Sequence, residues 1–543
     1  MEIQTVKKME KEALKGSSID FMRLGFALFF MVAVLVYSFL STGGIPNNMF
    51  LAIAALFGAY MAMNIGANDV ANNVGPAVGS KALTMGGAIV IAAIFEGAGA
   101  FIAGGDVVKT IKKGIIDISA FGGNVDPFIW AMMAALLAAA LWLNFATMMK
   151  APVSTTHSIV GGVMGAGIAA AGFSIVAWGT MAKIAASWII SPVLGGVIAA
   201  VFLFSIKKTM VYKEDKITAA RKWVPVFVAL MSWAFVTYLT LKGLKKVWPD
   251  IVDVLAFLPD EKKPSFIVAA IFGLIIAGIV YMIVKKTVGI KAQKIDNDRA
   301  GINSLFTVPL IFAAALLSFA HGANDVANAI GPLAAINDAV MTGGISAEAG
   351  IPIWVMGVGA LGIALGLALY GPKLIKTVGS EITELDQMRA FSVAMAASIT
   401  VIIASQLGLP VSSTHIAVGG IFGVGFLREY LEGSTKKDNI AIEEEAIIDE
   451  KKLLKAFNSE RKTLEAKEEK EQADYERIVE LYRMIDAEEE MIKESKKHLK
   501  TAKKVQYVKR DAVKKIIAAW IITVPAAALL SAAIFFMIKG IVL

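Results

Sequence analysis

A phrase rich in Asn and Asp occurs twice in this chain, as GANDVANNVGP from Gly66 and as GANDVANAIGP from Gly322. Each copy lies in apolar surroundings, where burying a carboxylate is costly. Carboxylate and amide oxygens are the ligands that hard cations prefer, so the pattern favours a pair of Na⁺ sites over a hydrogen-bonded clamp between helices. The candidate ligands are Asn68, Asp69, Asn72, Asn324, Asp325 and Asn328. The Pro residues that follow, Pro76 and Pro332, predict a break or bend in each helix.

A second phrase is repeated as PVSTTH from Pro152 and as PVSSTH from Pro410. Pro followed by small hydroxyl residues is typical of a helix start, and the free N–H groups of such a start attract anions. Two such starts meeting near the membrane midplane would hold a tetrahedral oxyanion, and ordinary helix capping is the alternative. The hydroxyl donors are Ser154, Thr155, Thr156, Ser412, Ser413 and Thr414.

Other polar residues near these phrases have more than one possible role. His157 and His415 occupy matching positions, where they can bind the anion, carry a proton or cap a backbone carbonyl. Glu96 is an acid in an apolar segment, either a coupling residue or a packing clamp. Gln406 precedes the second PVSSTH phrase and can add an amide to the same site. His321 directly precedes the second Asp motif, but symmetry gives it no support because its counterpart is Ile65.

The elements that must position these residues are membrane-spanning helices. The chain has 543 residues, of which 57% are hydrophobic and only 18% charged, and its mean hydropathy is +0.66. We expect an all-α polytopic membrane protein of about twelve membrane elements, some of them broken or re-entrant. The apolar runs lie at 21–40, 48–65, 84–104, 127–149, 152–172, 175–206, 223–241, 265–284, 302–320, 352–370, 389–408, 410–427 and 514–542.

The repeated phrases divide the chain into two homologous halves, interrupted by a charged segment at 430–512. Glu, Lys and Ala dominate this segment, and Leu, Ile and Met recur in it at helical spacing, which predicts a soluble antiparallel helical hairpin rather than a disordered loop. A third, weaker repeat joins ASWIIS from Ala186 to AAWIIT from Ala518. Its offset exceeds that of the PVS phrases by roughly the length of the charged segment, which is therefore an insertion.

These observations predict six parts of the chain. They are an N-terminal tail and first helix (1–47), transport repeat 1 (48–222), connecting helices (223–301), the first part of repeat 2 (302–429), the insertion (430–512) and the last helix of repeat 2 (513–543). Lys and Arg are concentrated in 207–222 and 285–299, which places these loops in the cytoplasm. If the insertion is cytoplasmic too, the two repeats are inverted relative to each other.

Together, the duplicated GANDVAN and PVS[ST]TH phrases resemble those of the PiT family of inorganic phosphate transporters, especially its bacterial sodium-dependent members. The resemblance covers nearly all of 48–430 and 514–543. It implies symport of phosphate with a cation, an inverted repeat and a homodimer. Carried over by position, it implies cation and phosphate ligands at Asp69, Asn72, Asp325 and Asn328, and phosphate donors at Ser154, Thr155, Ser413 and Thr414. It also places the second-half counterpart of Glu96 at Ala394.

The expected function is Na⁺-coupled symport of inorganic phosphate by alternating access across the inner membrane of a cell. The expected partners are phosphate, Na⁺ as the co-transported ion, the lipid bilayer and a second copy of the chain, with neither a cofactor nor nucleic acid. The alternatives are a proton-coupled phosphate or sulfate permease of the same fold, a channel, and a membrane phosphoesterase. We do not expect an enzyme, since the candidate Ser and His share one helix and no orienting acid is adjacent. The absence of Cys excludes disulfides and thiolate sites.

Overall fold

The computed structural model describes residues 3–149, 151, 153–245, 247–254, 259, 261, 263–345, 351–381, 385–504, 508 and 510–542. Within these ranges the regular structure is helical, and the sole β-type pairing is an isolated bridge between Ile116 and Val176. Eleven helices of the described chain are long and apolar enough to cross a membrane. The all-α membrane class expected from the sequence is therefore confirmed.

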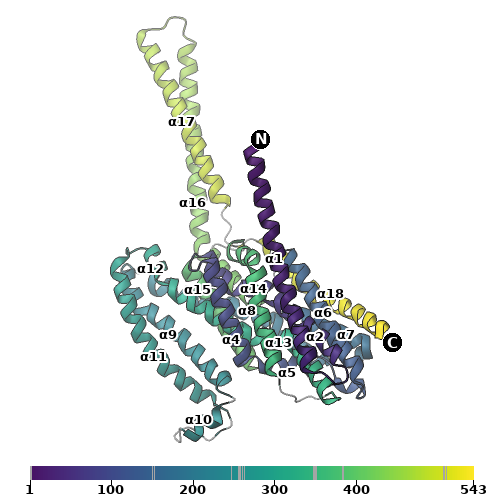
Figure 1. Cartoon of the computed structure of the whole chain (residues 1–543). Helices are drawn as coiled ribbons and strands as arrows, with labels where there is room; N and C mark the ends of the chain where they lie inside the picture. The colour runs from purple at the N-terminus through teal and green to yellow at the C-terminus, as the bar shows by residue number, and fades with distance from the viewer. Residues whose placement is uncertain are drawn as a thin grey trace. The chain divides into compact units, whose positions relative to one another are not determined.

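The helices follow the chain in the order shown in Figure 1. The first group is α1 (Ile3–Ser41), α2 (Asn48–Asn68), α3 (Val70–Gly79), α4 (Met85–Ala103), α5 (Gly105–Lys113), α6 (Val125–Met148), α7 (Thr155–Ala171) and α8 (Trp178–Ile206). The connecting group is α9 (Lys216–Gly243), α10 (Trp248–Val254), α11 (Phe266–Lys291) and α12 (Arg299–Leu305). The last group is α13 (Thr307–Thr342), α14 (Ile353–Glu381), α15 (Gln387–Gln406), α16 (Ser413–Glu465), α17 (Gln472–Lys504) and α18 (Arg510–Val542).

Close contacts between helix backbones are equivalent in the two halves. α2 packs against α14, and α13 packs against α4. Gly66 on α2 lies directly against the carbonyl of Ile363, and Gly322 on α13 lies against the carbonyl of Glu96 in the same way. Because Gly has no Cβ, the two helices of each pair can approach until their backbones touch.

Of the break or bend expected at each Gly-Pro pair, the break does not occur. α13 continues through Pro332 to Thr342, and Pro76 lies inside α3. A Pro removes one backbone hydrogen bond, but a helix buried among neighbours on nearly all sides tolerates this loss. The interruption in the first half lies earlier, at Asp69, between α2 and α3.

Two helices begin inside the bundle, as expected for re-entrant elements, and their first parts, from Thr155 in α7 and from Ser413 in α16, are called the half-helices. α7 begins at Thr155 after the loop that follows α6, and α16 begins at Ser413 after the loop that follows α15. Their start positions are three residues later than the apolar runs suggested, because the Pro-Val dipeptide precedes the capping Ser.

Residues Gly425–Val508 form a second compact unit, separate from the one made by Met1–Val424 and Lys509–Leu543. It contains the second part of α16 and the whole of α17, which lie side by side (Figure 1). Arg477 on α17 donates to Glu460 on α16 at 2.8 Å and thereby lowers the pKa of that carboxyl, while Lys503 lies 2.6 Å from Glu444. The charged segment is thus an antiparallel helical hairpin.

Candidate functional site

Asp69 lies where α2 ends and α3 begins, and its side chain is buried. Thr155, the first residue of α7, donates a hydrogen bond to its Oδ2 at 2.5 Å. Thr414, in the first turn of α16, donates to its Oδ1. One carboxylate therefore joins a half-helix from each half of the chain.

Asp325 is buried in the middle of α13 and has the mirror set of contacts. Ser413 of α16 donates to its Oδ2 at 2.6 Å, and the Thr156 hydroxyl of α7 lies 3.4 Å from its Oδ1 but has a nearer acceptor, the carbonyl of Val411, at 2.9 Å. The candidate hydroxyls and the two acids that the sequence singled out therefore meet in one place.

Asn72 and Asn328 complete this centre. The Asn72 amide nitrogen donates to Thr414 at 2.9 Å, and that of Asn328 donates to Thr155 and Thr156, at 3.1 Å each. The amide oxygens of both Asn residues are buried and have no hydrogen-bond partner within the described chain. Buried polar atoms are rarely left without a partner, so these two oxygens have capacity to bind a ligand.

Asn68 and Asn324, also expected as cation ligands, contact the helix ends and loops that precede the half-helices. Asn68 donates to Thr147 at 2.9 Å, and its amide oxygen accepts from the backbone N–H of Val153 at 3.2 Å. Asn324 donates to Ser405 at 3.0 Å and to the carbonyl of Leu409 at 3.4 Å, and its own amide oxygen has no hydrogen-bond partner within the described chain. These contacts fix where each half-helix starts.

Ser154 and Ser412 cap the half-helices. The Ser154 hydroxyl accepts from the backbone N–H of His157 at 3.1 Å, and the Ser412 hydroxyl accepts from that of His415 at 3.2 Å. This is the capping role that the sequence left open as the alternative to anion binding.

His321 belongs to this centre although the repeat symmetry gave it no support. Its Nδ1 lies 2.6 Å from Glu96 Oε2, and its Nε2 lies 2.7 Å from Asp325 Oδ2 and 4.0 Å from Asp69 Oδ2. Asn73 donates to the other oxygen of Glu96 at 2.7 Å. The partner of Glu96 that the sequence did not reveal is therefore a His, and its placement directly before the Asp motif was the available signal.

This His–Glu pair has no equivalent in the other half. Glu96 faces Gly322 as Ile363 faces Gly66, so its structural counterpart is Ile363. The expectation that Ala394 takes this place is wrong, because Ala394 lies on α15. Since the counterpart of His321 is Ile65, the two positions of this ionisable pair are occupied in the other half by Ile363 and Ile65.

His157 and His415 contact each other, with ring centroids 4.4 Å apart. Each also packs on the Trp of the repeated phrase ASWIIS or AAWIIT. The ring centroids of His157 and Trp188 are 3.8 Å apart, and those of His415 and Trp520 are 3.7 Å apart. All four ring nitrogens are buried and lack a hydrogen-bond partner within the described residues. The pair thus connects the two half-helices behind their first turns.

Gln406 is exposed at the end of α15, and it is not among the residues that contact the two acids. A cavity of about 600 Å³ lies on the other side of Thr147, lined among others by Arg23, Asn64, Asn144 and Tyr370. Because Thr147 also accepts the hydrogen bond from Asn68, one layer of side chains separates the cavity from the residue next to Asp69.

The centre combines three buried carboxylates, of Asp69, Glu96 and Asp325, with one imidazole. No Lys or Arg pairs with these acids in the part of the chain that the structure describes. Ligand atoms of Asp69, His321 and Asp325 lie within 4.8 Å of one another, close enough to share a bound cation. Excess negative charge in a buried place favours cation binding, and the N-termini of α7 and α16 favour an anion beside it.

Comparison with known proteins identifies the family. A model of the phosphate transporter family matches residues 65–531. The "Putative phosphate permease" of Helicobacter pylori strain J99 is 49% identical to this chain, over 98% of both chains. A relative from Pyrococcus abyssi, also described as a putative phosphate permease, is 39% identical over 70% of this chain and 89% of the relative's length. A solved structure described as "The sodium-dependent phosphate transporter" has 30% identity and a TM-score of 0.70, covering 91% of this chain and 99% of that one. The chain is a membrane protein that belongs to the phosphate transporter family.

Proposed function

We propose that the chain is a Na⁺-coupled symporter of inorganic phosphate that works by alternating access. The observation that carries this proposal is that Asp69 accepts from the half-helices of both halves, while Asp325 accepts from Ser413 of α16 and lies 3.4 Å from the Thr156 hydroxyl of α7. A change at either acid therefore reaches the helix starts of both halves.

The hydrogen bonds suggest how Na⁺ and phosphate are coupled. A hydroxyl has one proton to donate, and in this structure Thr155 and Ser413 donate theirs to Asp69 and Asp325. Na⁺ bound at a carboxylate oxygen competes for that acceptor and leaves the hydroxyl proton available to a phosphate oxygen. Na⁺ also offsets the repulsion between the carboxylates and the incoming anion, which is large in a buried place.

The proposed ligands follow from these contacts. Na⁺ is held by the carboxylates of Asp69 and Asp325 and by the unpartnered amide oxygens of Asn72 and Asn328. Phosphate is held by hydroxyl groups at the N-termini of α7 and α16. Protonated phosphate has a hydrogen to donate to a carboxylate, whereas sulfate does not, so buried acceptors beside the anion favour phosphate.

The cavity beside Thr147 is a candidate route between this centre and one face of the membrane. Arg23 lines it and is paired with Asp20 at 3.2 Å. A cation at the wall of a cavity attracts an anion, and the acidic partner limits how tightly the anion is held.

The proposed setting is the inner membrane of a cell, with the loops at 207–222 and 285–299 and the hairpin in the cytoplasm. The equivalent contacts of Gly66 and Gly322 support two repeats, and the Lys/Arg bias supports their inversion. The resemblance to the family supports a homodimer, which crosslinking in native membranes would test.

A proton-coupled phosphate permease is the second candidate, and the contact between Glu96 and His321 is the observation that favours it. A buried His–carboxylate pair can exchange a proton in a membrane protein. The larger number of oxygen ligands around Asp69 and Asp325 favours Na⁺.

Uptake of labelled phosphate into proteoliposomes separates the two candidates. Na⁺ and pH gradients are imposed one at a time with the membrane potential clamped, and labelled sulfate is tested in parallel. We expect accumulation of phosphate under the Na⁺ gradient alone. Accumulation that follows only the pH gradient would leave the second candidate in place of the first.

A further inference from the structure

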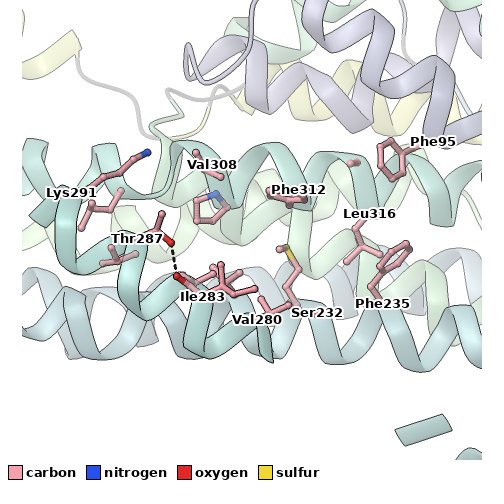
Figure 2. Close-up of a pocket in the computed structure, with 17 residues that line it drawn as sticks. Phe95, Ser232, Phe235, Val280, Ile283, Thr287, Lys291, Val308, Phe312 and Leu316 are labelled. Atoms are coloured by element: carbon pink, nitrogen blue, oxygen red, sulfur yellow. Dashed lines mark hydrogen bonds between the residues drawn. The ribbon is translucent and has the colours of Figure 1, made fainter. Parts of the chain in front are cut away.

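A groove of about 450 Å³ runs between α13 and the helical pair α9–α11. Figure 2 shows side chains from these helices around it, with Lys291 at one end and Phe95 at the other. Apart from Ser232, Thr287 and Lys291, the lining side chains are apolar. The groove is separate from the buried acids of the candidate site.

The groove exists because the α9–α11 pair packs on the rest of the unit unevenly. Near Phe95, Tyr238 and Phe235 pack edge-on against Phe319 in a buried cluster. Elsewhere along the groove, the lining side chains of Ile283 on α11 and Phe312 on α13 remain exposed. Water does not wet such an apolar surface readily, and an apolar surface of this kind on a membrane helix faces lipid.

The length and chemistry of the groove fit one lipid chain. From Val280 to Lys291, the α11 residues that line it extend about 16 Å at the usual helical rise. This is close to half of the roughly 30 Å hydrocarbon core, which one acyl chain spans. Lys291 is exposed at the end where α11 leaves its apolar stretch, and no acidic residue is among the groove's described lining.

We propose that this groove is a binding site for an anionic phospholipid. One acyl chain lies between α13 and α11, and the phosphate headgroup contacts Lys291. The Thr287 hydroxyl donates its proton to the carbonyl of Ile283 (Figure 2), so Lys291 is the groove's donor for the headgroup. The deep end of the groove is bounded by Phe95, the neighbour of Glu96, so the bound chain supports the helix that carries the Glu96–His321 contact.

The test compares bound lipids by native mass spectrometry of the purified full-length chain, titrated with an equal mixture of phosphatidylglycerol and phosphatidylethanolamine. We expect wild-type protein to prefer phosphatidylglycerol. Lys291→Gln should reduce that preference about fivefold, since one Lys near an anionic headgroup contributes on this scale. Lys286→Gln is the matched control, because Lys286 is an exposed residue of the same helix that does not line the groove.

A second pair of variants tests the acyl chain. Ser232→Leu narrows the groove and should reduce retention of both lipids, while Ser232→Ala should retain them. Equal lipid preference in Lys291→Gln and Lys286→Gln overturns the headgroup contact, and equal retention in Ser232→Leu and wild type overturns the site.

Spin labels locate the bound lipid directly and leave the groove's Lys and Ser in place. Because the protein contains no Cys, Phe312→Cys gives one label at the groove and Ile275→Cys gives one on an exposed part of α11 outside it. Spin-labelled phosphatidylglycerol should broaden the first signal at lower lipid fractions than the second. If a second labelled chain broadens the Phe312→Cys signal instead, another copy of the protein covers this face and the lipid site is wrong.

Discussion

Thr414 donates its hydroxyl proton to Asp69 although the two residues lie 345 positions apart in the sequence. In the other direction, the Thr156 hydroxyl lies 3.4 Å from Asp325 Oδ1, although its nearer acceptor is the carbonyl of Val411 at 2.9 Å. Each acid therefore lies beside a hydroxyl from the other half of the chain. If cation binding changes these hydrogen bonds, both half-helices respond together, which is what a symporter requires if neither half is to move alone.

The first prediction concerns the paired acids. Asp69→Asn and Asp325→Asn keep the size of the side chain but remove a negative charge. We expect each to weaken Na⁺ binding and to reduce phosphate uptake at least tenfold, the equivalent of about 1.4 kcal/mol. Thermal unfolding with and without Na⁺ measures the binding, because a ligand of the folded state raises its stability by mass action. Wild-type uptake together with an unchanged Na⁺ effect in both variants would remove the basis of the mechanism.

The second prediction compares Asn72, whose amide oxygen has no hydrogen-bond partner within the described chain, with Asn68, whose amide oxygen accepts from the backbone of Val153. Asn72→Ala should diminish Na⁺-induced stabilisation. Asn68→Ala removes contacts to Thr147, Val153 and the carbonyl of Ala151, and should lower the stability of the Na⁺-free protein by about 1–3 kcal/mol. Both are measured by thermal unfolding across a Na⁺ titration. The same response in both variants would contradict the division of roles.

The third prediction concerns the asymmetric pair. Glu96→Gln keeps a hydrogen bond to His321 but removes the charge and the proton exchange. If the pair only positions α4 against α13, uptake and its pH profile should stay near those of wild type. If it titrates during transport, the pH profile of uptake should flatten. His321→Gln is the complementary change, and we expect lower uptake because this side chain also lies 2.7 Å from Asp325.

The fourth prediction tests the backbone contacts of the two halves. A methyl group at Gly322 would overlap the carbonyl of Glu96, which cannot move without shifting α4. Gly322→Ala should therefore destabilise the protein by about 1–3 kcal/mol or prevent its accumulation in the membrane. Gly97→Ala is the control, since nothing lies within 4 Å of its added Cβ. Equal melting temperatures for the two variants would show that the helices are less closely packed than described.

The fifth prediction concerns the hairpin. Deleting about residues 433–510 and joining the ends with a short flexible linker should leave phosphate uptake measurable. The hairpin residues form their own compact unit, and the Pyrococcus abyssi relative matches over 89% of its own length while using only 70% of this chain. A deletion variant that inserts and folds, as judged by size-exclusion profile and Na⁺-induced stabilisation, but has no uptake would assign the hairpin a part in transport.

Much of the fold follows from local sequence. Long apolar runs must form helices in a membrane because every backbone polar group needs a partner there, and most run boundaries lie near helix ends. The helix does not break at Pro332 because packing around α13 outweighs the preference of Pro332 to end a helix. The charge and helical spacing of the insertion predicted it correctly. Its first helix, however, is the second part of α16, and no signal in the sequence marks where that part begins.

The sequence by itself singled out, through repetition, the residues that meet in the centre, including Asp69, Asp325 and the Thr155, Ser413 and Thr414 hydroxyls that donate to them. Only the tertiary structure decided how they connect: that Thr414 reaches Asp69, that Asn68 holds a loop, and that His321 faces Glu96. The physical reason is that repetition reports residues present in both halves, whereas Glu96 and His321 replace a pair of Ile side chains and occur once. The contact between His321 and Glu96 joins residues far apart in the chain. It is fixed by the packing of α4 against α13, and no local spacing in the sequence encodes it.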